Sequence, residues 1–481
     1  MSLERLAAAC LLPGFDGLAV PDWLRRWIED GLGGVVLFSH NVESREQLAA
    51  LTGELRGLLV VIDEEGGDVT RLEHDRGSSY PGNFALGVVD DVELTKEVGA
   101  AIGADLAAVG VTLNFAPVAD VNTNPRNPVI GIRSFGSEPE LVARHVAAFV
   151  RGMQEAGVAA CAKHFPGHGD TELDSHHELP TVGGDLGAAL LPFRAAIDAG
   201  VRAIMTAHIR VPELDDAPAT VSRRILHDLL REELGFAGLV ITDALDMKGV
   251  TATVGMEGAV RALAAGADAL CLGAGLGPEP VERVHRTIVD AVSTGRLPEE
   301  RLAEAAGRVA GMSAGASPGA RHVPGTEVGL EAARRALRAE GAVELARPPL
   351  VVELRPEPSI AAGPARHGLG DVLGAETVRL TGSPTAPLDH GGRQVVLVLR
   401  DAHRHEWERE AAEQVLATAP DAVVVETGIP LWRPRRAPGY VATNGAGRVN
   451  FEAAAEVLLA PRQLPSVDRS FQTDVREIRP S

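Results

Sequence analysis

A chain of 481 residues is too long for one ordinary domain and has the length expected of two. Hydrophobic residues make up 45% of it and charged residues 23%, the balance of a globular protein with a sizeable core. The formal net charge is −20 and the aromatic content is 4%. Such a chain is a poor partner for phosphate backbones or anionic membranes, so we expect binding to neither nucleic acid nor membrane.

The three cysteines, Cys10, Cys161 and Cys271, are far apart and lie in apolar runs. They provide neither a disulfide framework nor a paired CxxC zinc site, so we interpret them as buried thiols in a reducing compartment. No run reaches transmembrane length, and residues 1–12 lack the basic and apolar regions of a signal peptide. We therefore expect a cytoplasmic protein.

The first part of the chain alternates short apolar runs with amphipathic helical segments. The runs predict strands at residues 10–12, 34–38, 58–62, 112–115, 159–162, 203–205, 239–241 and 269–272. Helices are predicted between them, for example at 92–109, 140–156 and 222–234. Strands that alternate with helices indicate a parallel sheet. Eight of them match an α/β fold of the (β/α)8 barrel type, for which about 250 residues is typical. A doubly wound open sheet is the alternative, since periodicity alone does not close a barrel.

The second part begins after residues 313–325, which are rich in glycine and proline, lack periodicity and predict a linker. The predicted helices are 327–338, 406–418 and 448–459, and the predicted strands are 351–354, 377–380, 395–399, 422–426 and 441–443. We therefore expect a barrel over residues 1–312, a linker with a connecting helix over 313–344, and a smaller α/β domain over 345–481.

Polar side chains end several of the predicted barrel strands. They are Asp63, Lys163 with His164, Thr206 with His208, and Thr242 with Asp243. Active sites of such barrels lie at the carboxyl ends of the strands, so we expect these side chains to converge. A carboxylate at Asp243 would be held by its strand and could attack an anomeric carbon. It could equally cap the next helix, and Asp246 is an alternative carboxylate in the following turn.

The segment KHFPGHGDTELDSHHELP, residues 163–180, is dense in glycine, proline, aspartate and histidine and must be a loop. Within it Asp174 precedes His176 by two residues. In a turn this spacing lets Asp174 hold one ring nitrogen while the other faces a substrate. A histidine near its reference pKa of about 6.5 can deliver and retrieve a proton, an effect of roughly 10²–10⁴-fold. The alternative is an ordinary surface histidine beside an acid.

Metal and phosphate sites are not predicted. Histidines that could bind a metal are His164, His168, His176, His177 and His208. There is, however, no H-E-x-x-H motif and no H-x-H pair ending a strand, and Lys163 would place a cation beside the ion. The glycine-rich stretches 65–67 and 273–277 match neither GxGxxG nor a P-loop. We therefore expect no metal and no cofactor.

The loop KHFPGHGDTELDSHHELP resembles the signature loop of the β-N-acetylglucosaminidases of glycoside hydrolase family 3. The segments GGVVLFSHNVES, IDEEGG, NFAPVADVN, NPVIGIRSFG, MTAHI and LVITDALDM resemble the other blocks of that family, in the same order. The resemblance covers roughly residues 33–273. It implies a (β/α)8 barrel that is often followed by an α/β sandwich domain.

The resemblance also implies roles for individual residues. Asp243 matches the catalytic nucleophile, and Asp174 with His176 matches the Asp–His dyad that serves as acid and base. The residues that match the sugar-binding positions of the −1 subsite are Asp63, Arg133, Lys163 and His164. The sequence departs from the family at IDQEGGR, which here is IDEEGGD. We expect Glu64 and Asp68 to add negative charge at the rim of the site.

The expected reaction removes terminal β-linked N-acetylglucosamine from a small glycoside, a peptidoglycan fragment or a chito-oligosaccharide, by two displacements with retention. Replacing a carboxylic acid by a histidine removes one negative charge facing the incoming nucleophile, so a phosphorylase that uses phosphate is the first alternative. Others are a β-glucosidase, substrate-assisted hydrolysis and a non-catalytic sugar-binding protein. We expect the C-terminal domain to matter more for stability than for chemistry. The oligomeric state is left open.

Overall fold

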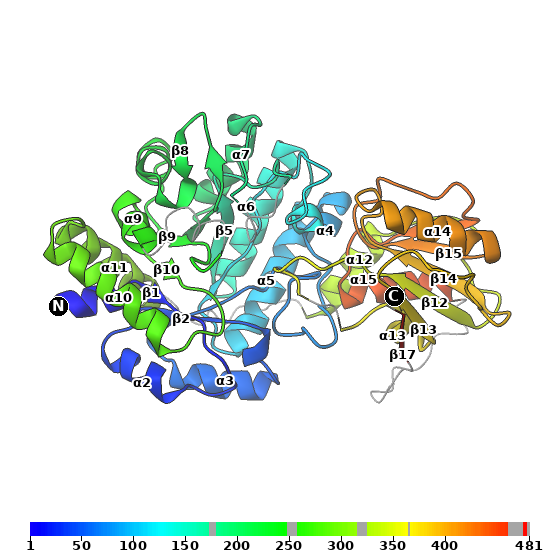
Figure 1. Cartoon of the computed structure of the whole chain (residues 1–481), viewed down its shortest axis with the longest axis horizontal. Helices are drawn as coiled ribbons and strands as arrows, with labels where there is room; N and C mark the ends of the chain where they lie inside the picture. The colour runs from blue at the N-terminus through cyan, green and yellow to red at the C-terminus, as the bar shows by residue number, and fades with distance from the viewer. Residues whose placement is uncertain (173–178, 248–256, 315–324, 364–365, 460–474, 479–481) are drawn as a thin grey trace. The chain divides into compact units, whose positions relative to one another are not determined.

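The computed structural model describes residues 1–172, 179–247, 257–314, 325–363, 366–459 and 475–478. The chain divides into two compact units (Figure 1). The first comprises Met1–Glu65, Val92–Ile130 and Ser134–Gly325, and the second comprises Gly66–Asp91, Gly131–Arg133 and Thr326–Ser481. Two short segments from within the barrel sequence therefore belong to the second unit. The domain boundaries drawn from the sequence at 312 and 345 stay a prediction.

Eight parallel strands form the sheet of the first unit. Six are neighbours in one sheet, in the order β2 (Gly34–Leu37), β3 (Leu59–Ile62), β4 (Leu113–Asn114), β5 (Ala159–Phe165), β6 (Ala203–Thr206) and β9 (Leu239–Thr242). The other two, β1 (Leu11–Leu12) and β10 (Leu270–Cys271), pair in parallel. Single parallel bridges, Gly14 to Val36 and Ile241 to Ala269, join this pair to both edges of the six-stranded sheet. The strands therefore form a closed ring, which confirms the barrel and excludes the open sheet.

Every second residue of these strands faces the barrel core, as the pleat requires. The core contains Leu59 and Val61 of β3, Ala203 and Met205 of β6, and Cys161 of β5. All three cysteines are buried and unpaired, as predicted. The strand ends that carry polar side chains are thus held by a packed interior.

Helices lie outside the ring of strands (Figure 1). They are α1 (Leu3–Ala9), α2 (Asp22–Glu29), α3 (Arg45–Glu54), α5 (Val92–Ala108), α6 (Pro139–Glu155), α7 (Leu186–Asp198), α9 (Gly258–Ala265), α10 (Pro278–Ser293) and α11 (Glu299–Ala314). The predicted helix at 222–234 is a π-helix, η4 (Arg224–Glu233). Short additions are the hairpin of β7 (Arg210–Val211) and β8 (Asp215–Pro218) and the 3-10 turns η1 (Ser39–Asn41) and η3 (Ala219–Val221).

The second unit is built on a seven-stranded sheet. Its strands, from one edge to the other, are β11 (Arg338–Gly341), β16 (Gly439–Ala442), β15 (Val423–Glu426), β14 (Gln394–Leu399), β12 (Pro349–Leu354), β13 (Thr377–Leu380) and β17 (Val475–Ile478). Only the pair of β11 and β16 is antiparallel among these strands. The helices of the unit are α4 (Asn83–Val89), α12 (Glu327–Ala336), α13 (Leu369–Leu373), α14 (Glu406–Thr418) and α15 (Arg448–Leu458), with the turn η2 (Gly131–Arg133).

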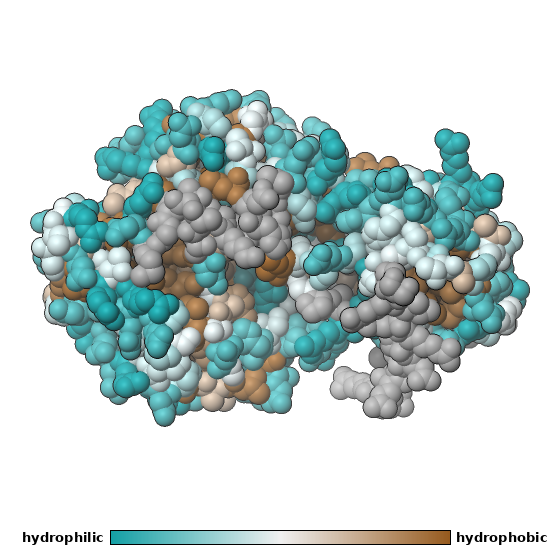
Figure 2. Space-filling model, viewed as in Figure 1, coloured by the Kyte–Doolittle hydropathy of each residue, from teal (hydrophilic) through white to brown (hydrophobic). Residues whose placement is uncertain are grey.

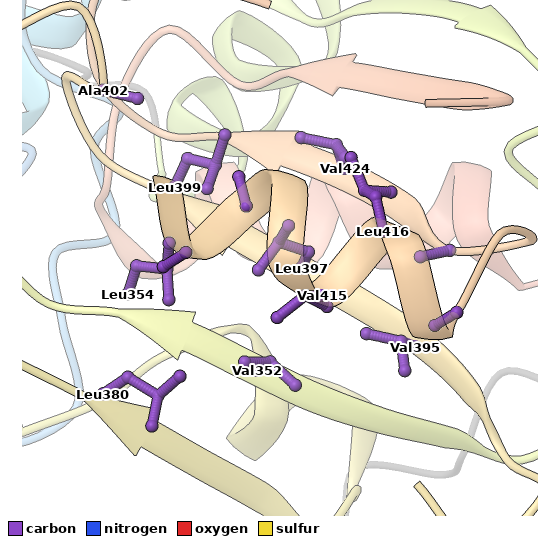
Figure 3. Packing of buried hydrophobic residues seen from close by; sticks show 14 of the residues in the cluster. Val352, Leu354, Leu380, Val395, Leu397, Leu399, Ala402, Val415, Leu416 and Val424 are labelled. Carbon is purple, nitrogen blue, oxygen red and sulfur yellow. The ribbon is translucent and has the colours of Figure 1, made fainter. Parts of the chain in front are cut away.

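Helices cover both faces of this sheet. On one face, Val352, Leu397 and Leu399 pack against Val415 and Leu416 of α14 (Figure 3). On the other face, strand residues with intervening numbers, among them Val351, Val396 and Val425, pack against the helices α13 and α15. The helices contribute Leu369 from α13 and Phe451 and Leu458 from α15. This arrangement confirms the smaller α/β domain.

Several elements of the second unit were not predicted, namely α4, η2, β11, α13 and β17. All four residues of β11 are exposed, so this edge strand has no alternation of apolar and polar residues to reveal it. The predicted helix 327–338 accordingly ends at Ala336, two residues early. A helix of five residues, such as α13, is too short to show a periodic pattern.

In the view of Figure 2, hydrophilic residues cover most of the surface that is drawn in colour. The large exposed hydrophobic residues among those described are only Met1, Leu18, Ile360 and Leu431. No described helix combines the length and the apolar character that crossing a bilayer needs.

A buried ion cluster lies where the last barrel strand begins. Asp268 is fully buried, and its carboxylate lies 2.6 Å from Arg231, 2.6 Å from Arg301 and 3.0 Å from Arg308. It also accepts a hydrogen bond of 3.0 Å from the backbone N–H of Val240 in β9. Since this is the amino-terminal end of the strand, we assign the cluster to stability rather than to chemistry.

We expect Asp268→Asn to lower the free energy of unfolding by about 3–5 kcal/mol, because it removes the countercharge from partly buried arginines. Urea unfolding followed by circular dichroism measures the change. The matched control is Glu304→Gln, which removes an ion pair with the same Arg301 and Arg308 at a half-exposed position. The control is expected to cost less than about 1 kcal/mol. Equal effects of the two variants would contradict the assignment.

Candidate active site

Lys163 is a buried charge near the carboxyl end of β5. Its side chain is only 2% exposed, and Nζ lies 2.6 Å from Asp63 Oδ1 and 2.6 Å from Glu65 Oε1. A buried ammonium group is tolerated only when it is paired, so the two carboxylates hold it in place. Asp63 is 18% exposed and keeps an edge open to a ligand, whereas Glu65 is buried. Asp63 and Lys163 are thus brought together, and Glu65, read from the sequence only as part of a turn, is an additional member.

His164 is oriented by a buried carboxylate. Its Nδ1 lies 2.7 Å from Asp120 Oδ2, and Asp120 is fully buried. The other oxygen of Asp120 accepts the backbone N–H groups of His164 (3.2 Å) and His168 (2.7 Å). Because the Asp120 carboxylate can only accept a hydrogen bond, His164 Nδ1 carries the proton. This bond also fixes the orientation of the ring. Asp120 was missed in the sequence, where it appeared only as one residue of the NFAPVADVN block.

His168 is a neutral, structural histidine. It is buried, its Nδ1 lies 2.9 Å from Thr171 Oγ1, and its ring stands edge-on to His164 at 6.0 Å. Burial disfavours the charged ring and lowers the pKa of His168 to about 4, although Asp120 opposes this effect. Within the described ranges, no group of three His, Cys, Asp or Glu side chains is placed to hold a metal ion.

Asp243 directly follows β9 and is half-buried. Its Oδ1 accepts the N–H of Ala244 at 2.8 Å. A helix cap would instead accept from the second or third helical residue, and residues 244–247 are not helical. Asp246, the alternative carboxylate, is exposed in this turn.

Ala244, whose N–H bonds Asp243, is itself held through its carbonyl group by a buried histidine. His208, after β6, donates from Nε2 to the carbonyl oxygen of Ala244 at 2.9 Å, and its Nδ1 lies 2.7 Å from Thr220 Oγ1. His208 is fully buried. It therefore connects the ends of β6 and β9 and positions the chain beside Asp243.

Lys163, Asp63 and Asp243 all act electrostatically on the buried thiol of Cys161, which places these three charges near one another. Burial is the main cause that raises the pKa of this thiol. Asp120, His164 and Asp243 likewise act electrostatically on His168. The first unit thus brings together the predicted residues from the ends of β3, β5 and β9.

Other predicted residues are not placed in this group. Asp174 and His176 lie outside the described residues, so the dyad stays a prediction. Arg133 is buried and belongs to the second unit, where its carbonyl oxygen accepts a hydrogen bond of 2.7 Å from Asn83. Its part in sugar binding also stays a prediction.

The expectation that Glu64 and Asp68 add negative charge at the rim of the site stays a prediction. Glu64 is only 2% exposed, and its backbone exchanges hydrogen bonds of 2.9 and 2.8 Å with the side chain of Asn114. Asp68 forms an ion pair with Arg400 inside the second unit. The backbone of Glu64 and the side chain of Asp68 thus have partners that the local sequence does not reveal.

Comparison with known proteins gives a family and several relatives. The family described as glycosyl hydrolase family 3 N terminal domain matches residues 14–312. The chain is 37% identical over 315 residues to a beta-hexosaminidase A of Pseudoalteromonas piscicida, a match that covers 58% of this chain and 52% of that protein. The chain thus spans about half the length of that relative. It is 40% identical over 253 residues to a beta-hexosaminidase of Bordetella avium, covering 49% and 72% respectively.

Solved structures extend the likeness to both units. A glycoside hydrolase family 3 beta-N-acetylglucosaminidase from Paenibacillus has a TM-score of 0.83 and 33% identity, with 97% of both chains covered. A beta-glucoside phosphorylase has a TM-score of 0.74 over 95% of this chain and 91% of its own, but at 19% identity it shares the fold alone.

His168 is expected to make stability depend on pH. Its pKa is about 4 in the folded chain and about 6.5 in an unfolded one, so the unfolded state takes up the proton first as the pH falls. The free energy of unfolding should fall between pH 6.5 and pH 4 by about 3 kcal/mol, and level off below that. In His168→Gln this decrease in the free energy of unfolding between pH 6.5 and pH 4 should be absent. Urea titrations at a series of pH values measure it, with the partly exposed His227→Gln as control. An unchanged slope in His168→Gln would overturn the assignment.

Proposed function

Since the chain belongs to glycosyl hydrolase family 3, we propose that this glycoside hydrolase is a retaining, exo-acting β-N-acetylglucosaminidase. The observation that carries the proposal is the placement of Asp243 at a strand end near the paired Lys163 and Asp63. A rigid carboxylate beside groups that can bind sugar hydroxyls is what double displacement at an anomeric carbon needs. The likeness to a beta-N-acetylglucosaminidase over nearly the whole chain supports the choice of sugar.

The first step forms a covalent glycosyl-enzyme. Asp243 attacks C1 of the sugar while His176, as an imidazolium held by Asp174, protonates the leaving oxygen. The bond between C1 and the glycosidic oxygen breaks, and the aglycone leaves as an alcohol. In the second step the neutral His176 removes a proton from water, the hydroxide attacks C1, and Asp243 is released. The sugar departs with its original anomeric configuration.

Substrate binding falls to the groups around Lys163. Asp63 presents its partly exposed carboxylate to a sugar hydroxyl, and Lys163 holds that carboxylate at 2.6 Å. His164, fixed by Asp120, and Arg133 complete the proposed −1 subsite. Because Lys163 and Asp120 are buried and bonded, Asp63 and His164 are oriented before the substrate arrives.

The proposed substrates are peptidoglycan fragments or chito-oligosaccharides with a terminal N-acetylglucosamine. We further propose that the reaction takes place in the cytoplasm, as part of peptidoglycan turnover. Three buried, unpaired thiols in a chain of this length support a reducing compartment.

The proposal is tested with an aryl β-N-acetylglucosaminide and the matching aryl β-glucoside, in EDTA, with and without phosphate. We expect the N-acetyl substrate to react at least about 100-fold faster, since a site that hydrogen-bonds a substrate group rejects the analogue that lacks it. The product should be free N-acetylglucosamine in both buffers. Formation of the sugar 1-phosphate would identify a phosphorylase, and preference for the glucoside would identify a β-glucosidase. Release from neither substrate would contradict the proposed activity.

A second test addresses the covalent step. A 5-fluoro N-acetylglucosaminyl fluoride should label the protein once, and peptide mass spectrometry should find the adduct on Asp243. Substrate-assisted hydrolysis predicts no adduct. In His176→Ala we expect turnover of an alkyl glycoside to fall by roughly 10²–10⁴-fold. An aryl glycoside with a good leaving group should lose less, since its departure needs little protonation. Equal losses with both leaving groups would exclude His176 as the acid.

A further inference from the structure

The loop after β3 joins the active site to the second unit through two glycines. Asp63 and Glu65 bond Lys163, and the chain then passes through Gly66 (φ +82°) and Gly67 (φ +63°), conformations that favour glycine. The N–H of Gly67 donates to the carbonyl oxygen of Tyr80 at 2.8 Å. The path of the chain out of the site is therefore defined.

Asp68, the next residue, forms an ion pair with Arg400, which follows β14. The side chains are 11% and 30% exposed, so the pair is largely shielded from water. Burial, the largest single effect, lowers the pKa of Arg400, but nearby carboxylates outweigh it and raise the pKa, with Asp68 the strongest of them. The N–H of Arg400 donates to the buried Glu408 at 3.0 Å, which fixes the backbone on that side.

Further contacts hold the rest of this segment, which we call the tether (residues 66–91), within the second unit. They are Arg71 to the carbonyl oxygen of Ala361 (2.9 Å), Asp75 to Arg366 (2.8 Å), Ser79 to Arg448 (2.6 Å) and Asp91 to Arg335 (2.9 Å). Among these side-chain contacts, the one made by Asp68 is nearest in sequence to the active site. Asp68 is also one of the two positions in this block at which the chain departs from the family pattern.

We propose that the Asp68–Arg400 ion pair positions Asp63 and Glu65, and through them Lys163, so that the second unit is required for full activity. The proposal rests on the proposed function. Asp68 and Arg400 are positioning residues, because neither is assigned a contact with substrate. This role differs from the expectation that the C-terminal domain matters mainly for stability.

The short connection makes the coupling effective. Only Gly66 and Gly67 separate Glu65 from Asp68, and an extended chain spans at most about 3.6 Å per residue. The two residues between them can absorb only a small displacement, so a movement of Asp68 should also move Glu65. Misplacement of a binding group by about 1 Å can cost on the order of 10²-fold in rate.

The test compares Asp68→Asn, Arg400→Met and the double variant in the full chain, with the aryl N-acetylglucosaminide as substrate. We expect kcat/KM to fall by about 10-fold to 100-fold in each single variant, and the double variant to be no worse. The matched control is Arg334→Met, which removes a two-bond ion pair with Glu456 (2.7 and 2.5 Å) in the same unit. The control should keep the wild-type kcat/KM.

Hydrogen exchange gives a readout that does not depend on activity. Peptides covering residues 59–72 should exchange faster in Asp68→Asn and Arg400→Met than in the wild type or in Arg334→Met. Arg400→Lys, which keeps the charge, should recover part of both effects. If both folded variants keep wild-type kcat/KM and exchange, the tether has no positioning role. If the wild type itself lacks glycosidase activity, the proposed function fails, while exchange still decides whether the pair orders the loop.

Discussion

The candidate active site depends on one buried ammonium group. Lys163 lies between Asp63 and Glu65 with almost no exposure to solvent, so its charge must be balanced inside the protein. Both carboxylates come from the loop after β3, whereas Lys163 comes from β5. The pairing therefore links two strands that are not neighbours in the ring, and it fixes the loop that leads toward the second unit.

The same principle recurs at the other strand ends. Buried polar groups must be hydrogen-bonded, and each such bond here ties a loop to a neighbouring strand. Asp120 orients His164, and His208 holds the peptide beside Asp243. The barrel strands set the positions of these side chains, and their buried hydrogen-bond partners set the orientations. In the proposed site, these side chains are therefore oriented before a sugar binds.

The second unit contains more than the C-terminal part of the chain. Residues 66–91 lie between β3 and α5 in sequence but are held by contacts with Arg400, Arg448 and Arg335. The segment begins directly after Glu65, a partner of Lys163. The second unit is thus continuous in sequence with a partner of Lys163, and the proposed positioning role rests on this continuity.

The sequence by itself determined the eight barrel strands, the sheet of the second unit and the strand-end position of Asp243, because burial imposes a regular alternation and loops carry polar residues. It missed β11, whose exposed residues carry no such pattern. Only the tertiary structure decided that Glu65 pairs with Lys163, Asp120 with His164, and Asp68 with Arg400. These partners are 98, 44 and 332 residues apart, respectively. Side chains so distant meet only through the closed fold, and no local period in the sequence records which of them will do so.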